Sequence, residues 1–78
     1  MPRYYFDIRD GDALFPDEEG MELDDQRAAE IEAAQALAGL AKDLSPLDER
    51  HDMAIEVRSN EGLIFQAALV FEARRLKQ

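Results

Sequence analysis

The chain is 78 residues long, with nine basic and eighteen acidic side chains, a formal net charge of −9 and no cysteine. This length predicts a single domain over residues 1–78, and without cysteine the chain has neither disulfides nor thiolate metal sites. The acidic surface disfavours nucleic acid and anionic membranes as partners. We therefore expect a soluble, cytoplasmic protein that binds neither.

The N-terminal part predicts a β-hairpin. Residues 4–9 alternate between apolar and polar side chains, which is the period-2 pattern of a half-buried strand. Asp10-Gly11 tolerates positive φ angles and predicts a type I′ turn. Residues 13–15 predict the return strand, which ends at Pro16 because proline has no N–H to donate to a ladder.

An alanine-rich segment predicts a helix over about residues 25–44, which ends before Pro46. Residues 53–58 and 63–71 alternate as two further strands around a turn that contains Gly62. The order β-β-α-β-β predicts an α+β fold, in which two hairpins form an antiparallel sheet and one helix packs on one face. The predicted core residues are Phe6, Ile8, Leu37, Leu40, Ile55, Val57, Phe65 and Leu69.

The last strand is apolar on both faces, which is unusual for a strand with one face in water. One helix covers only one face of the sheet, so the other face should meet a partner. The candidate interface residues are Tyr5, Ile64, Gln66, Ala68 and Val70. We expect a homodimer, formed either through this face or through exposed strand edges.

Four charged side chains point outward on the first and third predicted strands: Asp7, Arg9, Glu56 and Arg58. If these strands are neighbours, the four side chains can form a lattice of cross-strand ion pairs. The alternative is a charged recognition patch on the sheet face.

Residues 10–32 are strongly acidic, but they do not fit a calcium loop, because Phe15 and Met21 stand where that loop needs glycine and glutamate. We predict a solvated hairpin and loop without a metal. His51 is expected to be an exposed histidine in a charged connector. No nucleophile or phosphate loop accompanies it, so we expect no catalytic residue, no cofactor and no enzymatic activity. Residues 72–78 predict a frayed basic tail.

Three segments resemble a known family: MPRYYFDIRDGDALFPDEEGMEL at the N-terminus, AAEIEA in the helix and IEVRSNEGLIF in the final hairpin. They are similar to short alphaproteobacterial proteins catalogued as a domain of unknown function. That resemblance implies a fold but no activity, and members often carry histidine where this chain has Asp7. A weaker local likeness, in FPDEEG and the helix after it, is to HicB-type antitoxins.

Two classes of function are compatible with these features. The first is a small acidic protein-interaction or regulatory module that acts as a homodimer. The second is an antitoxin-like or nucleic-acid-mimicking inhibitor of a partner protein with a basic surface. Co-purification with a basic protein would favour the second class.

Overall fold

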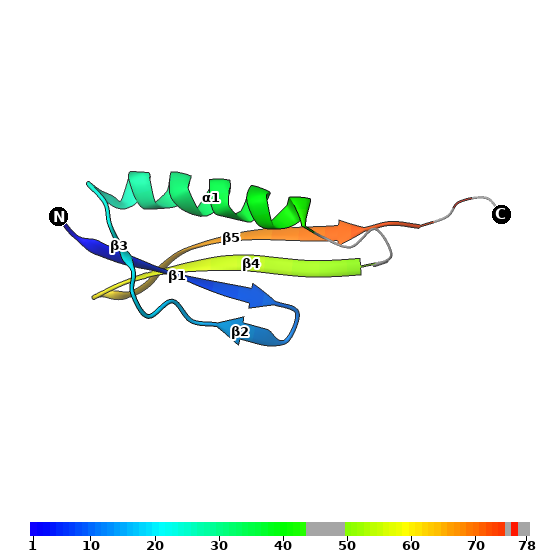
Figure 1. Ribbon diagram of the computed structural model, residues 1–78, viewed down its shortest axis with the longest axis horizontal. Helices are drawn as coiled ribbons and strands as arrows, with labels where there is room; N and C mark the ends of the chain where they lie inside the picture. Colours follow the sequence, from blue (N-terminus) through cyan, green and yellow to red (C-terminus); the bar gives the residue numbers. More distant parts are fainter. Residues whose placement is uncertain (44–49, 75, 77–78) are drawn as a thin grey trace.

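The computed structural model describes residues 1–43, 50–74 and 76. Within these residues the chain forms, in order, β1 (Arg3–Asp10), β2 (Ala13–Phe15), β3 (Met21–Glu22), α1 (Gln26–Lys42), β4 (Arg50–Ser59) and β5 (Gly62–Glu72). The strands pair antiparallel in the order β2-β1-β4-β5, and β3 pairs with the start of β1. The helix lies along one face of this sheet (Figure 1), so the α+β fold predicted from the sequence is confirmed.

Helix α1 begins where its sequence supplies a cap. The side chain of Asp25 accepts a hydrogen bond of 2.9 Å from the N–H of Ala28, which satisfies one of the free donors at the helix start. Ala29, Ala33 and Leu37 recur every four residues and form the buried stripe of the helix. Two of the three are alanines, which lets the helix axis approach the sheet closely.

The hydrophobic core lies between α1 and the strands β1, β4 and β5. Ile55 and Val57, at the centre of β4, are the largest fully buried side chains among the described residues. The buried cluster consists of Tyr4, Ala29, Ala33, Leu37, Met53, Ile55 and Val57. Of the predicted core, Leu37, Ile55 and Val57 are buried, while Phe6, Ile8, Leu40, Phe65 and Leu69 are partly buried and pack against the cluster.

Strand β3 was not predicted from the sequence. It pairs Met21 with Tyr4 and Glu22 with Arg3. Two residues are too few to show a period-2 pattern, so pairing with β1 defines this strand. The observed order is therefore β-β-β-α-β-β.

The first hairpin turns one residue later than predicted. Asp10 pairs with Ala13, which leaves Gly11 and Asp12 as the central turn residues. Gly11 has a φ of 59°, but Asp12 has no positive φ. A type I′ turn needs positive φ at both positions, so the predicted turn type is wrong.

Strand β4 is longer than its apolar alternation predicts. It begins at Arg50, and His51 pairs with Phe71, so the backbone of His51 lies in a strand and not in the predicted connector. Ser59 pairs with Gly62, which shortens the predicted four-residue loop to two residues. Pairing with the long partner β5 extends β4 through polar residues that have no strand pattern of their own.

A bulge in β5 changes which side chains face the helix. Val57 pairs with Phe65, but the next residue of β4, Arg58, pairs with Leu63, so Ile64 is an extra residue. Ile64 is half-buried and packs against the core cluster. Leu63 instead shares the face of Arg58 and is 62% exposed. The prediction that Ile64 lies on the uncovered face is therefore wrong.

Strand β5 also includes Glu72, the first residue of the predicted basic tail. Residues 75, 77 and 78 of that tail lie outside the described residues. In the described ranges, no helix is long and apolar enough to cross a membrane.

Candidate functional site

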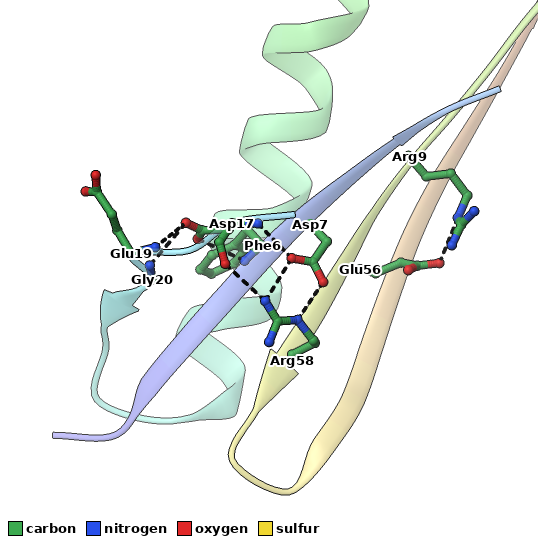
Figure 2. A network of polar contacts seen from close by, with 8 residues as sticks. All are labelled: Phe6, Asp7, Arg9, Asp17, Glu19, Gly20, Glu56 and Arg58. Carbon is green, nitrogen blue, oxygen red and sulfur yellow. Dashed lines mark hydrogen bonds and ion pairs between the residues drawn. The ribbon is translucent and has the colours of Figure 1, made fainter. Parts of the chain in front are cut away.

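The sheet face turned away from α1, here called the open face, carries the predicted charged patch. Asp7 and Arg9 reach it from β1, and Glu56 and Arg58 reach it from β4. Arg58 Nε donates to Asp7 Oδ2 at 2.6 Å, and Arg9 Nε donates to Glu56 Oε2 at 3.2 Å (Figure 2). The four side chains thus form two cross-strand ion pairs.

Arg58 is the centre of this network. Its Nη2 atom donates to Asp7 Oδ1 at 3.1 Å and to the backbone oxygen of Asp17 at 3.0 Å. Its guanidinium carbon lies 4.8 Å from the centre of the Tyr5 ring, within the range of a cation–π contact. The two bonds to Asp7 give the fork geometry that makes arginine–carboxylate pairs strong and directional. Asp7 is only 6% exposed beneath them.

Asp17 links the loop between β2 and β3 to this network. Its Oδ2 atom accepts from the N–H of Phe6 at 3.1 Å, in the stretch of β1 between the residues paired with β2 and those paired with β3. Its Oδ1 atom accepts from the N–H groups of Glu19 and Gly20, each at 3.1 Å. The N–H of Asp17 donates to Asp7 Oδ1 at 2.9 Å. The Asp17 carboxylate therefore takes the place of a neighbouring strand as the partner of β1 at Phe6, and it also closes the loop between β2 and β3.

The sequence prediction did not include Asp17 in the site. The pattern Asp-x-x-Gly over residues 17–20 is typical of an aspartate that accepts bonds from the next backbone N–H groups, and this signal indicates a structured loop. The contact with Arg58 joins residues 41 positions apart, so no local pattern predicts it.

Gly20 is required where the loop returns to β1. Its φ is 73°, and an added Cβ would lie 2.9 Å from Tyr5 Cε2 and 3.0 Å from the backbone oxygen of Tyr4. We expect Gly20→Ala to lower the free energy of unfolding by about 1–2 kcal/mol, measured by denaturant unfolding. Gly39→Ala is the control, because a Cβ there meets nothing within 4 Å and should stabilise the helix by about 0.5–1 kcal/mol. Equal effects of the two changes would contradict the close packing at Gly20.

The network shifts the pKa values of its members. The two hydrogen bonds from Arg58 hold the pKa of Asp7 below its ordinary value of 3.8, and the same bonds raise the pKa of Arg58. Burial of the Asp17 carboxyl group opposes its ionisation. The N–H groups of Gly20, Phe6 and Glu19 outweigh this burial, so the pKa of Asp17 is also lowered.

These shifts predict how stability depends on pH. Carboxylates with a lowered folded-state pKa stabilise the fold fully above the unfolded-state pKa, near 3.8, and lose this contribution as the pH falls through the folded-state pKa. We expect the free energy of unfolding to fall between about pH 5 and pH 2, and to fall less in the double variant Asp7→Asn, Asp17→Asn. The control Asp12→Asn, Asp24→Asn removes two exposed carboxylates outside the network. If both double variants lose stability with pH equally, the network does not act in this way.

Next to the charged network, the open face becomes apolar along β5. Gln66 is exposed, and its Nε2 atom donates to Glu56 Oε2 at 3.0 Å. Ala68 is exposed and Val70 is 58% exposed, whereas Tyr5 is half-buried next to Arg58. A shallow depression of about 150 Å³ is lined by Arg9, Gly11, Asp52, Met53, Ala54, Ala68, Leu69 and Val70. Of the five predicted interface residues, all except Ile64 lie on this face.

The lowered pKa values limit what the Asp7 and Asp17 carboxylates can do as proton donors or acceptors. Asp7 and Asp17 stay ionised near neutral pH, whereas a general acid or base works best with a pKa near the operating pH. Over the described part of the chain, no group of three or more acidic or histidine side chains is placed to hold a metal ion. The absence of metal, cofactor and enzymatic activity stays a prediction.

Comparison with known proteins yields a family but no activity. A search of curated proteins found no match, and a search of solved structures found none. Residues 3–70 match a family model described as a domain of unknown function, DUF6894. The match includes β1 to β4, most of β5 and the whole charged network. The chain therefore belongs to the DUF6894 family.

Proposed function

We propose that this protein is a small acidic protein-interaction module that acts as a homodimer and recognises a partner protein through its open face. The observation that carries the proposal is the combination on that face of a fixed charged network with exposed apolar side chains. Arg58 is already held by Asp7 and Asp17, so its ordering costs little when a partner binds. Leu63 and Val70 are exposed apolar side chains beside this network. Protein interfaces typically combine apolar contacts with a polar border, and arginine is enriched among the residues that contribute most to binding.

A photo-reactive amino acid placed at Gln66 tests this proposal. Gln66 is exposed on the open face, and Gln35 is an exposed glutamine on α1 that serves as the matched control. After irradiation in the native cell, we expect cross-links to a second kind of protein from position 66 and only background from position 35. Cross-links between two copies of the chain are recognised by their mass. If position 66 captures no other protein, or both positions capture the same proteins equally, the open face is not the recognition surface.

A second candidate function is inhibition of a basic partner protein, in the manner of an antitoxin or a nucleic-acid mimic. It is favoured by the charge between residues 10 and 32, where ten carboxylates accompany the single cation Arg27. Such a complex would be electrostatic and would weaken as salt is added. In the same experiment, this function predicts capture from position 35, next to the acidic side chains of α1. When a cell lysate is irradiated instead, the yield of this cross-link should fall as salt is added before irradiation.

A further inference from the structure

The two outer strands of the sheet differ in how well their edges are protected. On one side, β2 has three residues and is followed by Pro16 and the acidic loop. Short strands, proline and charge are the devices by which proteins prevent pairing at a sheet edge. On the other side, β5 has eleven residues, and Gly62–Phe71 contains no charged side chain and no proline. Within the described part of a chain whose net charge is −9, β5 is therefore an outer strand whose edge is open to pairing.

The helix carries an exposed apolar stripe in addition to its buried one. Ile31 is 46% exposed, and Ala34 and Ala38 follow it at helical spacing and are also exposed. Strands β3 and β4 are both antiparallel to β1, so α1 is a crossover between parallel strands, and such crossovers are right-handed. Figure 2, in which α1 lies behind the sheet, shows the same hand. This hand places Ala34 on the flank of α1 toward the free edge of β5, Ala38 and Ile31 further round on the same side toward solvent, and Gly39 on the opposite side.

We infer that a second copy of the chain pairs antiparallel with β5 about a two-fold axis at Ala67, so that one sheet runs through both copies. Ala67 is the midpoint of β5, and pairing there overlaps the two strands along their whole length. The bulge at Ile64 then brings Leu63 opposite Val70 of the other copy, so that these two apolar side chains pack side by side on the open face. This contact rests on the proposed homodimer and specifies its geometry.

The position of helix α1 is compatible with the same two-fold axis. Helix α1 contacts both β4 and β5 and runs in the same direction as β5 (Figure 1). Because α1 lies over β4 and β5, its axis is about one strand spacing from the two-fold axis. The helices of the two copies are therefore about two strand spacings, or about 10 Å, apart, which is a normal distance between packed helices. Figure 1 shows α1 over the middle part of β5, and Ala34 is the midpoint of α1. Ala34 therefore lies nearest the axis, and Ile31 of one helix lies toward Ala38 of the other. The small side chains of Ala34 and Ala38 permit the two helices to approach this closely.

Two neighbouring helix residues provide a matched test. Ala38→Glu and Gly39→Glu each add one negative charge at an exposed helix position, but on opposite sides, and a Cβ at Gly39 meets nothing within 4 Å. In sedimentation equilibrium we expect Ala38→Glu to weaken the dimer at least about tenfold, because two carboxylates would be buried at the contact. Gly39→Glu should leave the dissociation constant unchanged.

A cross-link tests the axis itself. The chain has no cysteine, so Ala67→Cys introduces one thiol per copy. Directly opposite residues of paired strands have Cα atoms about 4.5–5.5 Å apart, within the reach of a disulfide, whereas sheets packed face to face lie about 10 Å apart. We expect mild oxidation to link Ala67→Cys into dimers much faster than Ala13→Cys, an exposed position on the opposite edge.

The possible failures are distinguishable. If the unmodified chain is a monomer, both the homodimer and this contact are wrong. If it is a dimer but Ala38→Glu and Gly39→Glu dimerise alike, or Ala67→Cys cross-links no faster than Ala13→Cys, the homodimer stands and the β5 contact is overturned.

Discussion

Replacing Ile55 with alanine should lower the free energy of unfolding by about 2–5 kcal/mol, the largest single effect expected in this chain. Ile55 is 1% exposed at the centre of β4, where it pairs with Ile8 on one side and Ala67 on the other. Its removal leaves a cavity between three strands and α1 that the neighbours fill only partly. Denaturant unfolding measures the change, and a loss below about 0.5 kcal/mol would contradict the core described above.

Two leucines on α1 provide a control for which face of the helix is buried. Leu37 belongs to the buried cluster, whereas Leu40 is half-buried at its margin. Both changes to alanine keep the helix propensity high, so any difference reports burial. We expect Leu37→Ala to be the more destabilising of the two, and the reverse order would mean that α1 is rotated relative to the sheet.

The second large effect is expected at Asp17. Asp17→Ala removes the acceptor for three backbone N–H groups. The N–H of Phe6 is partly buried, so water is a poor substitute for the carboxylate there. Hydrogen bonds to charged groups contribute about 1.5–3 kcal/mol, so we expect a loss of about 2–3 kcal/mol in the free energy of unfolding. Because the loop also positions the backbone oxygen that Arg58 contacts, the cation–π contact with Tyr5 should loosen as well.

Asp17→Asn separates the two roles of this carboxylate. The amide oxygen can still accept from Glu19 and Gly20 and close the loop, but the amide nitrogen cannot accept from Phe6. We expect a stability between those of the original chain and Asp17→Ala. If all three proteins unfold at the same denaturant concentration, the hydrogen bonds of the Asp17 carboxylate contribute nothing to the stability of the fold.

The fold could be predicted largely because its elements have local periodicity. The alternation at residues 4–9 and 63–71 and the alanine-rich stripe of α1 each indicate an element and its buried face. The features that were missed depend on partners distant in sequence. Strand β3 exists only by pairing with Arg3 and Tyr4, and the bulge at Ile64 is defined only by its register against β4.

The candidate site was predicted in the same partial way. The alternation along β1 and β4 predicted the outward side chains Asp7, Arg9, Glu56 and Arg58. Their ion pairs form because the two strands are neighbours. Asp17 was missed because a loop residue has no periodicity, and the path of the loop across β1 is a tertiary feature. The acidic segment, which was predicted to be a solvated hairpin and loop without a metal, contains Asp17, whose carboxylate accepts hydrogen bonds from three backbone N–H groups.

Sedimentation equilibrium of the unmodified chain at micromolar concentration tests the central proposal most directly. A homodimer predicts a mass of twice 8.9 kDa that falls toward 8.9 kDa on dilution, as expected for a reversible association. A mass of 8.9 kDa throughout the micromolar range would contradict the homodimer, and with it the contact along β5.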